Sequence, residues 1–133
     1  VSALNLLRLS MLTGDLKYST LADEVFYAFS GEFSRYPSGY GFMIYSMMYK
    51  EADILKAVIA AKSKKDASEL VEIIPKTAEI LLITDDEDMP LNLKKYTDGY
   101  IMHNDKPTVY LCKGRMCYPP VTDRKSLMEI LSL

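Results

Sequence analysis

The chain has few of the residues that mark a specialised class of protein. It contains two cysteines, one histidine and no tryptophan among 133 residues. Two cysteines cannot build the dense disulfide framework of a small secreted domain, so we expect a cytoplasmic location. No apolar run approaches the roughly 20 residues that a membrane-spanning helix needs, and no secretory signal is visible. We therefore expect no membrane partner.

Neither sign of charge is in excess. Sixteen lysines and arginines face 18 aspartates and glutamates, for a net charge of −2. Such a balance produces no field that attracts nucleic acid, so no nucleic-acid partner is predicted. The length suits one domain, or a fragment joined to a small domain. Helical periodicity begins directly at Val1, and we interpret the chain as a piece of a longer protein.

Residues 1–52 are predicted to form a helical segment. Ser2 can cap a first helix that ends at Gly14, and Asp15 can cap a second helix that ends at Pro37. The apolar residues of the second helix recur at spacings of three and four, as in an amphipathic helix. A third run, residues 42–49, is apolar almost all round and rich in methionine. It should be buried or lie against a missing partner.

Residues 53–133 are predicted to form a small α/β domain. Continuous apolar runs at 54–60 and 80–84 read as buried parallel strands, with a helix over 66–74 between them that a capping box at Asp66 begins. A short helix over 90–96, a hairpin of strands 99–102 and 108–112, and a last helix capped by Thr122 or Asp123 complete the domain. The order β-α-β-(α)-β-β-α is α/β or α+β. It matches a thioredoxin-like fold, with a small Rossmann-like sheet carrying an antiparallel edge as the alternative.

Both ends of the chain carry distinctive motifs. The start, Ser2-Ala3-Leu4-Asn5-Leu6-Leu7-Arg8-Leu9 with Leu12-Thr13-Gly14-Asp15 and Tyr18, resembles the last helical hairpin of an (α/α)-barrel shared with N-acylglucosamine 2-epimerases. Together with Tyr110-Leu111-Cys112, Cys117 and Pro120-Val121-Thr122-Asp123, it makes the chain similar to the C-terminal end of the YyaL / spermatogenesis-associated, thioredoxin-domain-containing family.

The resemblance implies an architecture more than a reaction. Members of that family carry an N-terminal thioredoxin-like domain, a six-hairpin, glycosidase-like helical barrel and a small α/β tail. By this resemblance the chain is a non-catalytic structural C-terminal module of a larger protein. Its partner would be the upstream barrel of the parent chain, or a second copy through the helical face. The alternative is part of a carbohydrate-active, epimerase-like or thiol-redox enzyme whose catalytic residues lie mostly upstream.

Cys112 and Cys117 are the candidate functional pair. A turn at residues 113–116 could bring their Cα atoms within the roughly 4.4–6.8 Å that a disulfide needs. Lys113 and Arg115 would favour the thiolate form. However, redox-active thioredoxin folds hold their cysteines where the first strand meets the first helix, and residues 61–66 contain none. We expect structural cysteines, with Cys112 packed beneath the last helix; a reversible redox pair and metal ligation are the alternatives.

Three further groups of polar residues are weaker candidates. His103 could join the cysteines as a third zinc ligand or act as a general base, but an exposed turn residue is favoured. The acidic run Asp85-Asp86-Glu87-Asp88 could hold Mg²⁺, and Lys62, Lys64 and Lys65 could receive an anion at a helix start. Solvated loops are favoured for both. Residues 36–49 could offer a sugar-stacking surface, although core packing is favoured. We assign no catalytic residue, cofactor or metal.

Overall fold

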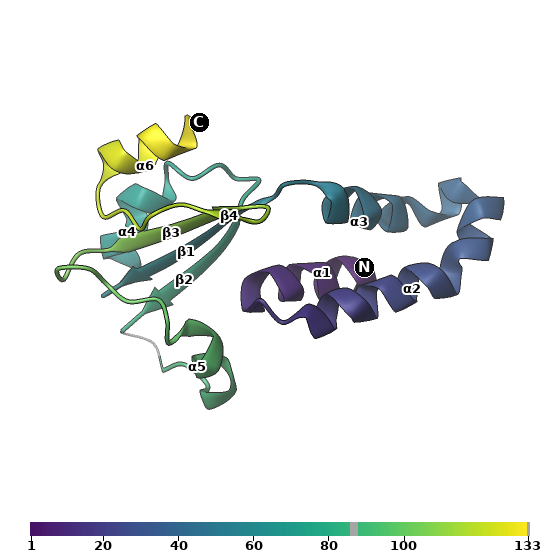
Figure 1. Ribbon diagram of the computed structural model, residues 1–133, viewed down its shortest axis with the longest axis horizontal. Helices are drawn as coiled ribbons and strands as arrows, with labels where there is room; N and C mark the ends of the chain where they lie inside the picture. Colours follow the sequence, from purple (N-terminus) through teal and green to yellow (C-terminus); the bar gives the residue numbers. More distant parts are fainter. Residues whose placement is uncertain (86–87, 133) are drawn as a thin grey trace. The chain divides into compact units, whose positions relative to one another are not determined.

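The chain forms two compact units. The computed structural model describes residues 1–85 and 88–132, and it divides into Val1–Asp53 and Ile54–Leu133. Helices make up the first unit, and a mixed sheet with interleaved helices makes up the second (Figure 1). The predicted α+β class is therefore confirmed. Among the described residues, no helix combines the length and apolar character that crossing a membrane requires.

The helical unit consists of α1 (Ser2–Thr13), α2 (Leu16–Arg35), a 3₁₀ turn η1 (Pro37–Tyr40) and α3 (Gly41–Glu51). α1 packs against both α2 and α3. Gly14 ends α1 in the left-handed region at φ 74°, and its N–H donates to the Ser10 carbonyl over 2.9 Å. Asp15 caps α2 as predicted, accepting from the Lys17 N–H at 3.0 Å. The predicted cap at Ser2 is wrong: Ser2 lies inside α1, whose N-cap is Val1.

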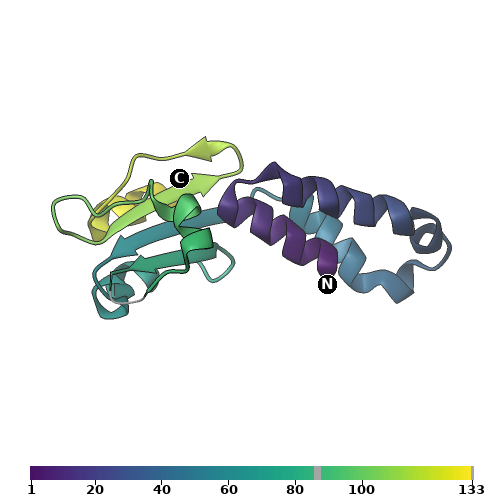
Figure 2. The same cartoon turned by 90° about the horizontal axis from the view of Figure 1, so that it is seen from below.

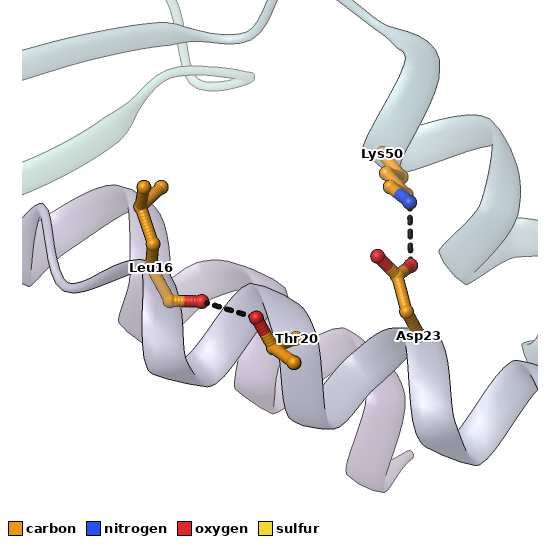
Figure 3. Close-up of polar contacts among 4 residues, drawn as sticks. All are labelled: Leu16, Thr20, Asp23 and Lys50. Atoms are coloured by element: carbon orange, nitrogen blue, oxygen red, sulfur yellow. Dashed lines mark hydrogen bonds and ion pairs between the residues drawn. The ribbon is translucent and has the colours of Figure 1, made fainter.

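The core of the helical unit is thin. It has few buried apolar side chains, and two of them are alanines: Ala3, Leu7, Ala22 and Tyr49. The buried Ser46 satisfies its hydroxyl within α3 by donating to the Phe42 carbonyl at 2.7 Å. Lys50 of α3 and Asp23 of α2 point toward one another and form an ion pair (Figure 3). Because both side chains are partly exposed, this pair adds little to stability, typically about 0–1 kcal/mol.

The α/β unit is built on a four-stranded sheet with the order β2-β1-β3-β4. Its elements are β1 (Leu55–Ala61), α4 (Lys64–Val71), β2 (Glu79–Thr84), α5 (Leu91–Thr97), β3 (Thr108–Lys113), β4 (Met116–Cys117) and α6 (Arg124–Leu131). β1 and β2 are parallel, as predicted, and β3 is antiparallel to both β1 and β4 (Figure 2). An antiparallel strand thus lies inside the sheet, which favours the thioredoxin-like alternative over the Rossmann-like one.

One face of the sheet carries the core. α4 and α6 cover it, and the fully buried side chains there come from alternate strand positions and from both helices: Ala57, Ile59, Val109, Leu111, Ala67 and Leu127. The segment after α5 reaches the opposite face, where the Tyr100 ring meets the Tyr110 ring edge-on at 5.1 Å. Residues of β3 therefore alternate between a packed face and a more open one, as the period of a strand requires.

The predicted hairpin of strands 99–102 and 108–112 is wrong. Residues 100–102 form no strand, and only an isolated bridge pairs His103 with Lys106. Between them Asn104 and Asp105 both adopt positive φ, at 53° and 57°, which identifies a tight type I′ turn. The side chain of Tyr110 holds this segment in place of a backbone ladder. The hairpin that does form joins β3 to β4.

Two helix starts refine the prediction. The expected cap at Asp66 is wrong, because the N-cap of α4 is Ser63, three residues earlier, and α4 ends at Val71 rather than at residue 74. The Ser63 Oγ accepts from the Asp66 N–H at 3.3 Å and donates to the Asp66 carboxylate at 3.0 Å. Of the two candidate caps for α6, Asp123 is the one used, accepting from the Ser126 N–H at 2.9 Å. Side-chain caps of this kind satisfy N–H groups that have no partner within the helix.

Candidate functional site

Cys112 and Cys117 form a disulfide across the β3–β4 hairpin. They are direct partners in the antiparallel register, with Cα atoms 4.0 Å apart. The Tyr118 N–H donates to the Leu111 carbonyl at 2.9 Å, so the adjacent cysteine pair is the closely spaced, non-hydrogen-bonded kind. Gly114 adopts φ 58° at the first central position of the two-residue turn, as a type II′ turn requires. The turn therefore sets the register that brings the two sulfurs together.

The disulfide lies on the open face of the sheet. Val109 and Leu111 contact the core under α4 and α6, so Cys112, one position later, faces the other way. Cys112 is half-buried and Cys117 is exposed. The prediction that Cys112 packs beneath the last helix is therefore wrong. It placed Cys112 with the apolar residues of the strand 108–112 and overlooked that successive residues of a strand face opposite sides.

A charged row crosses the open face at the level of the disulfide. Lys56 of β1 lies directly opposite Cys112, and Glu79 of β2 lies directly opposite Lys56. Directly opposed residues project to the same face of a sheet, with Cβ atoms about 4.5–5.5 Å apart. Burial lowers the pKa of the half-buried Lys56. Lys56 is thus the neighbour of Cys112 on β1, on the side of β3 away from Cys117.

Lys56 is the neighbour that sequence reasoning missed. Lys113, which the sequence offered as the cation next to Cys112, is paired with Leu55 and so projects to the opposite face. Lys56 is distant in sequence and becomes a neighbour only through the register of β1 with β3. The one signal present in the sequence was a single charged residue, Lys56, between the apolar residues Leu55 and Ala57 of the predicted strand.

His103 belongs to a structural cluster around Tyr110. The Tyr110 hydroxyl donates to the Ile101 carbonyl at 2.7 Å, accepts from the Ile101 N–H at 3.2 Å and lies 3.1 Å from His103 Nε2. The His103 N–H donates to Thr108 Oγ1 at 2.8 Å. His103 is exposed at the type I′ turn, as expected. These contacts fasten the segment after α5 to β3.

The charged loops form no assembled centre. Of the acidic run, Asp85 and Asp88 border a hollow of about 430 Å³ with Lys94 and Asp98, while Asp86 and Glu87 lie outside the described residues. Lys62 lies 3.9 Å from Asp105, an exposed ion pair. Across residues 1–85 and 88–132, no three histidine, cysteine or acidic side chains gather closely enough to hold a metal ion.

The helical unit contains an aromatic hollow of about 440 Å³. Its lining includes Phe29 of α2, Tyr40 of η1 and Phe42 of α3, together with Val25, Met43 and Ser46. The rings of Phe29 and Tyr40 are 6.4 Å apart. Its volume is within the usual range of small-molecule pockets, and it falls in the stretch that the sequence offered as a sugar-stacking surface.

Comparison with known proteins adds no relative. No family model, curated protein or solved structure matches this chain. The similarity to the C-terminal end of the YyaL / spermatogenesis-associated family stays a prediction that depends on the motifs at the two ends of the chain.

Proposed function

We propose that the chain is a non-catalytic structural module of a larger protein, and that its helical unit packs against further helices. In the architecture that the motifs imply, those helices belong to the upstream barrel of the parent chain. The α/β unit then serves as a separately folded tail. The observation that carries this proposal is the outer face of α3.

The outer face of α3 is apolar where a solvent-facing helix is polar. It consists of Ile44, Tyr45, Met47 and Met48, exposed by 36%, 54%, 42% and 66%. The side that packs within the unit is formed by Ser46 and Tyr49, which lie on the opposite side of the helix. A helix that is apolar on both sides is typical of one sandwiched between neighbours.

The rest of the unit fits the same explanation. Tyr27, Phe29 and Tyr36 on and after α2 are also exposed, by 83%, 45% and 65%. With few buried apolar side chains of its own, this unit gains little hydrophobic stabilisation from internal packing. A neighbouring layer of helices would bury the exposed rings and supply the missing part of the core.

The test is a pair of charge substitutions on the outer face with a matched control. Tyr45→Glu with Met48→Glu should reduce binding of an apolar-surface dye and any self-association in sedimentation equilibrium. Leu91→Glu with Ile101→Glu places the same charges at positions exposed by 84% and 60% in the α/β unit, and should change neither quantity. Equal effects from both pairs would contradict the proposal.

Cross-linking identifies what covers the face. In the full-length protein, a photoactivatable residue at position 48 should form adducts with upstream helices of the same polypeptide. Adducts only between two copies would replace this partner with self-association. Absence of adducts from position 48, with adducts formed from position 91, would overturn the docking role.

The aromatic hollow favours one second candidate, a contribution to a carbohydrate-active site in the parent. Aromatic faces stack on apolar faces of sugars, and Phe29, Tyr40 and Phe42 line this hollow. Titration with a monosaccharide while the tyrosine fluorescence or NMR signals are followed tests it directly. Saturable changes that Tyr40→Ala removes would favour this candidate over a purely structural role.

A further inference from the structure

We propose that the Cys112–Cys117 bond is a thiol-exchange site at which a small monothiol of the glutathione class attacks Cys117 and Cys112 leaves as a thiolate beside Lys56. The inference is independent of the docking role of the helical unit. It assigns different tasks to the two sulfurs, and the assignment follows from their positions in the sheet.

Cys117 is the accessible sulfur. It lies in β4, a strand of two residues at the edge of the sheet, and it is exposed, whereas Cys112 is half-buried in the internal strand β3. An attacking thiolate must reach one sulfur from the side away from the bond that breaks. Access at the sheet edge therefore directs attack to Cys117, and exposed disulfides are in general the labile ones.

Cys112 is the better leaving group. Lys56 opposes it directly across β1 and β3, and a neighbouring cation lowers the pKa of a thiol. A thiol of lower pKa leaves faster in thiol–disulfide exchange. Burial lowers the pKa of Lys56. A thiolate on Cys112 would act in the opposite direction and favour the charged form of Lys56.

The other charged groups near the bond act less directly. Glu79 lies on the far side of Lys56, Lys113 projects to the opposite face, and Arg115 lies in the exposed turn. Removal of the Lys56 charge should therefore slow the departure of the Cys112 thiolate more than removal of any of these other charges.

The exchange balances with thiols alone. A thiolate RS⁻ forms a bond to Cys117 Sγ, the Cys112–Cys117 bond breaks, and its electron pair stays on Cys112 as a thiolate. A second RS⁻ attacks the R sulfur of the mixed disulfide, releasing RSSR and the Cys117 thiolate. Two monothiols are thereby oxidised, and the protein disulfide is reduced to two thiols.

Opening the bond should leave the sheet intact. The disulfide closes a loop that the type II′ turn and the Tyr118–Leu111 hydrogen bond already close. Short loops of this kind lose little chain entropy when they close. The exchanged protein should therefore remain folded, so the mixed disulfide can be observed on the native chain.

The first experiment maps the adduct on the wild-type chain. The oxidised protein is incubated with millimolar glutathione, quenched with acid, and its free thiols are capped with N-ethylmaleimide. Trypsin cleaves after Lys113 and Arg115, which places the two cysteines on separate peptides. The expected product carries glutathione on Cys117 and the maleimide on Cys112. Glutathione mainly on Cys112, or no adduct during the loss of the disulfide, would overturn the proposal.

The second experiment compares two lysines. Lys56→Met should slow the first exchange step severalfold, because a leaving thiol of higher pKa departs more slowly. Lys113→Met removes the same charge next to Cys112 in sequence but on the other face, and should change the rate less. Lys56→Arg should restore the wild-type rate. Circular dichroism confirms that each variant is folded, and equal rates for Lys56→Met and wild type would remove Lys56 from the proposal.

Discussion

The two units of this protein differ in how they bury apolar side chains. The α/β unit places Ile59, Leu111 and Leu127 at 0%, 1% and 0% exposure between a sheet and two helices. The helical unit buries two large side chains, Leu7 and Tyr49, while several aromatic rings on α2 and α3 remain exposed. A sheet face covered by helices closes into a core with two layers, whereas the three helices of the first unit enclose few large apolar side chains.

The two units also differ in the polar and covalent contacts that hold their elements together. A disulfide and a satisfied Tyr110 hydroxyl hold the α/β hairpin and the loop that precedes it. An exposed ion pair between Asp23 and Lys50 links α2 to α3. The α/β unit should therefore fold by itself, and the helical unit should depend on its surroundings.

Separating the units should produce the largest effect. Expressed alone, residues 54–133 should remain folded and cooperative, since their core lies within these residues. Residues 1–53 alone should lose most of their helicity, because isolated helices with a thin core are marginal in water. Far-UV circular dichroism and amide NMR dispersion measure both. A cooperatively folded helical fragment would contradict the comparison.

Leu127→Ala should cost about 2–5 kcal/mol of unfolding free energy, because Leu127 of α6 is fully buried in the core of the α/β unit. Met48→Ala on the outer face of α3 should change the stability of the monomer by less than about 0.5 kcal/mol, as surface substitutions do. Urea unfolding followed by circular dichroism compares the two. A cost at Met48 approaching that at Leu127 would show that the outer face is covered within one chain.

Ser63→Ala should lower the stability of the α/β unit by about 1 kcal/mol, since it removes the N-cap of α4. Ser2→Ala is the matched control in the helical unit, because Ser2 makes no cap and lies inside α1. Its effect should be within experimental error. Thermal unfolding of both variants tests the difference. Equal losses of stability would show that the Ser2 hydroxyl stabilises the protein as much as the N-cap of α4 does.

Asp123 should make the smallest contribution, and one that depends on pH. The Ser126 N–H, and then its hydroxyl, lower the pKa of this α6 cap below its ordinary value of 3.8. A carboxylate with a lowered folded-state pKa stabilises the protein fully above its unfolded pKa, and this stabilisation is lost as pH falls through the folded pKa. Asp123→Asn keeps a capping residue but should flatten the decrease of Tm below about pH 4. Asp53→Asn, at an exposed position, should leave the decrease unchanged.

The elements were predictable where local patterns were strong. The strands β1 and β2, the Gly14 stop and the Asp15 cap all depend on nearby residues, and the structure confirms them. The burial expected for β2 is wrong, because β2 lies at the edge of the sheet and is mostly half-buried. The strand expected at 99–102 did not form, because contacts from Tyr110 and the turn at Asn104-Asp105 hold that segment without a ladder. The short edge strand β4 carried too few residues to show a period.

The candidate site likewise has features that are local in the sequence and features that depend on strand pairing. The sequence by itself determined that the two cysteines flank a glycine-containing turn, and that residues 42–49 are apolar almost all round, because both properties are local. Only the tertiary structure decided that the disulfide faces away from α6, and that Lys56 rather than Lys113 is the charge beside Cys112. The physical reason is register: a strand alternates its faces with every residue, and pairing with a distant strand selects which side chains share a face.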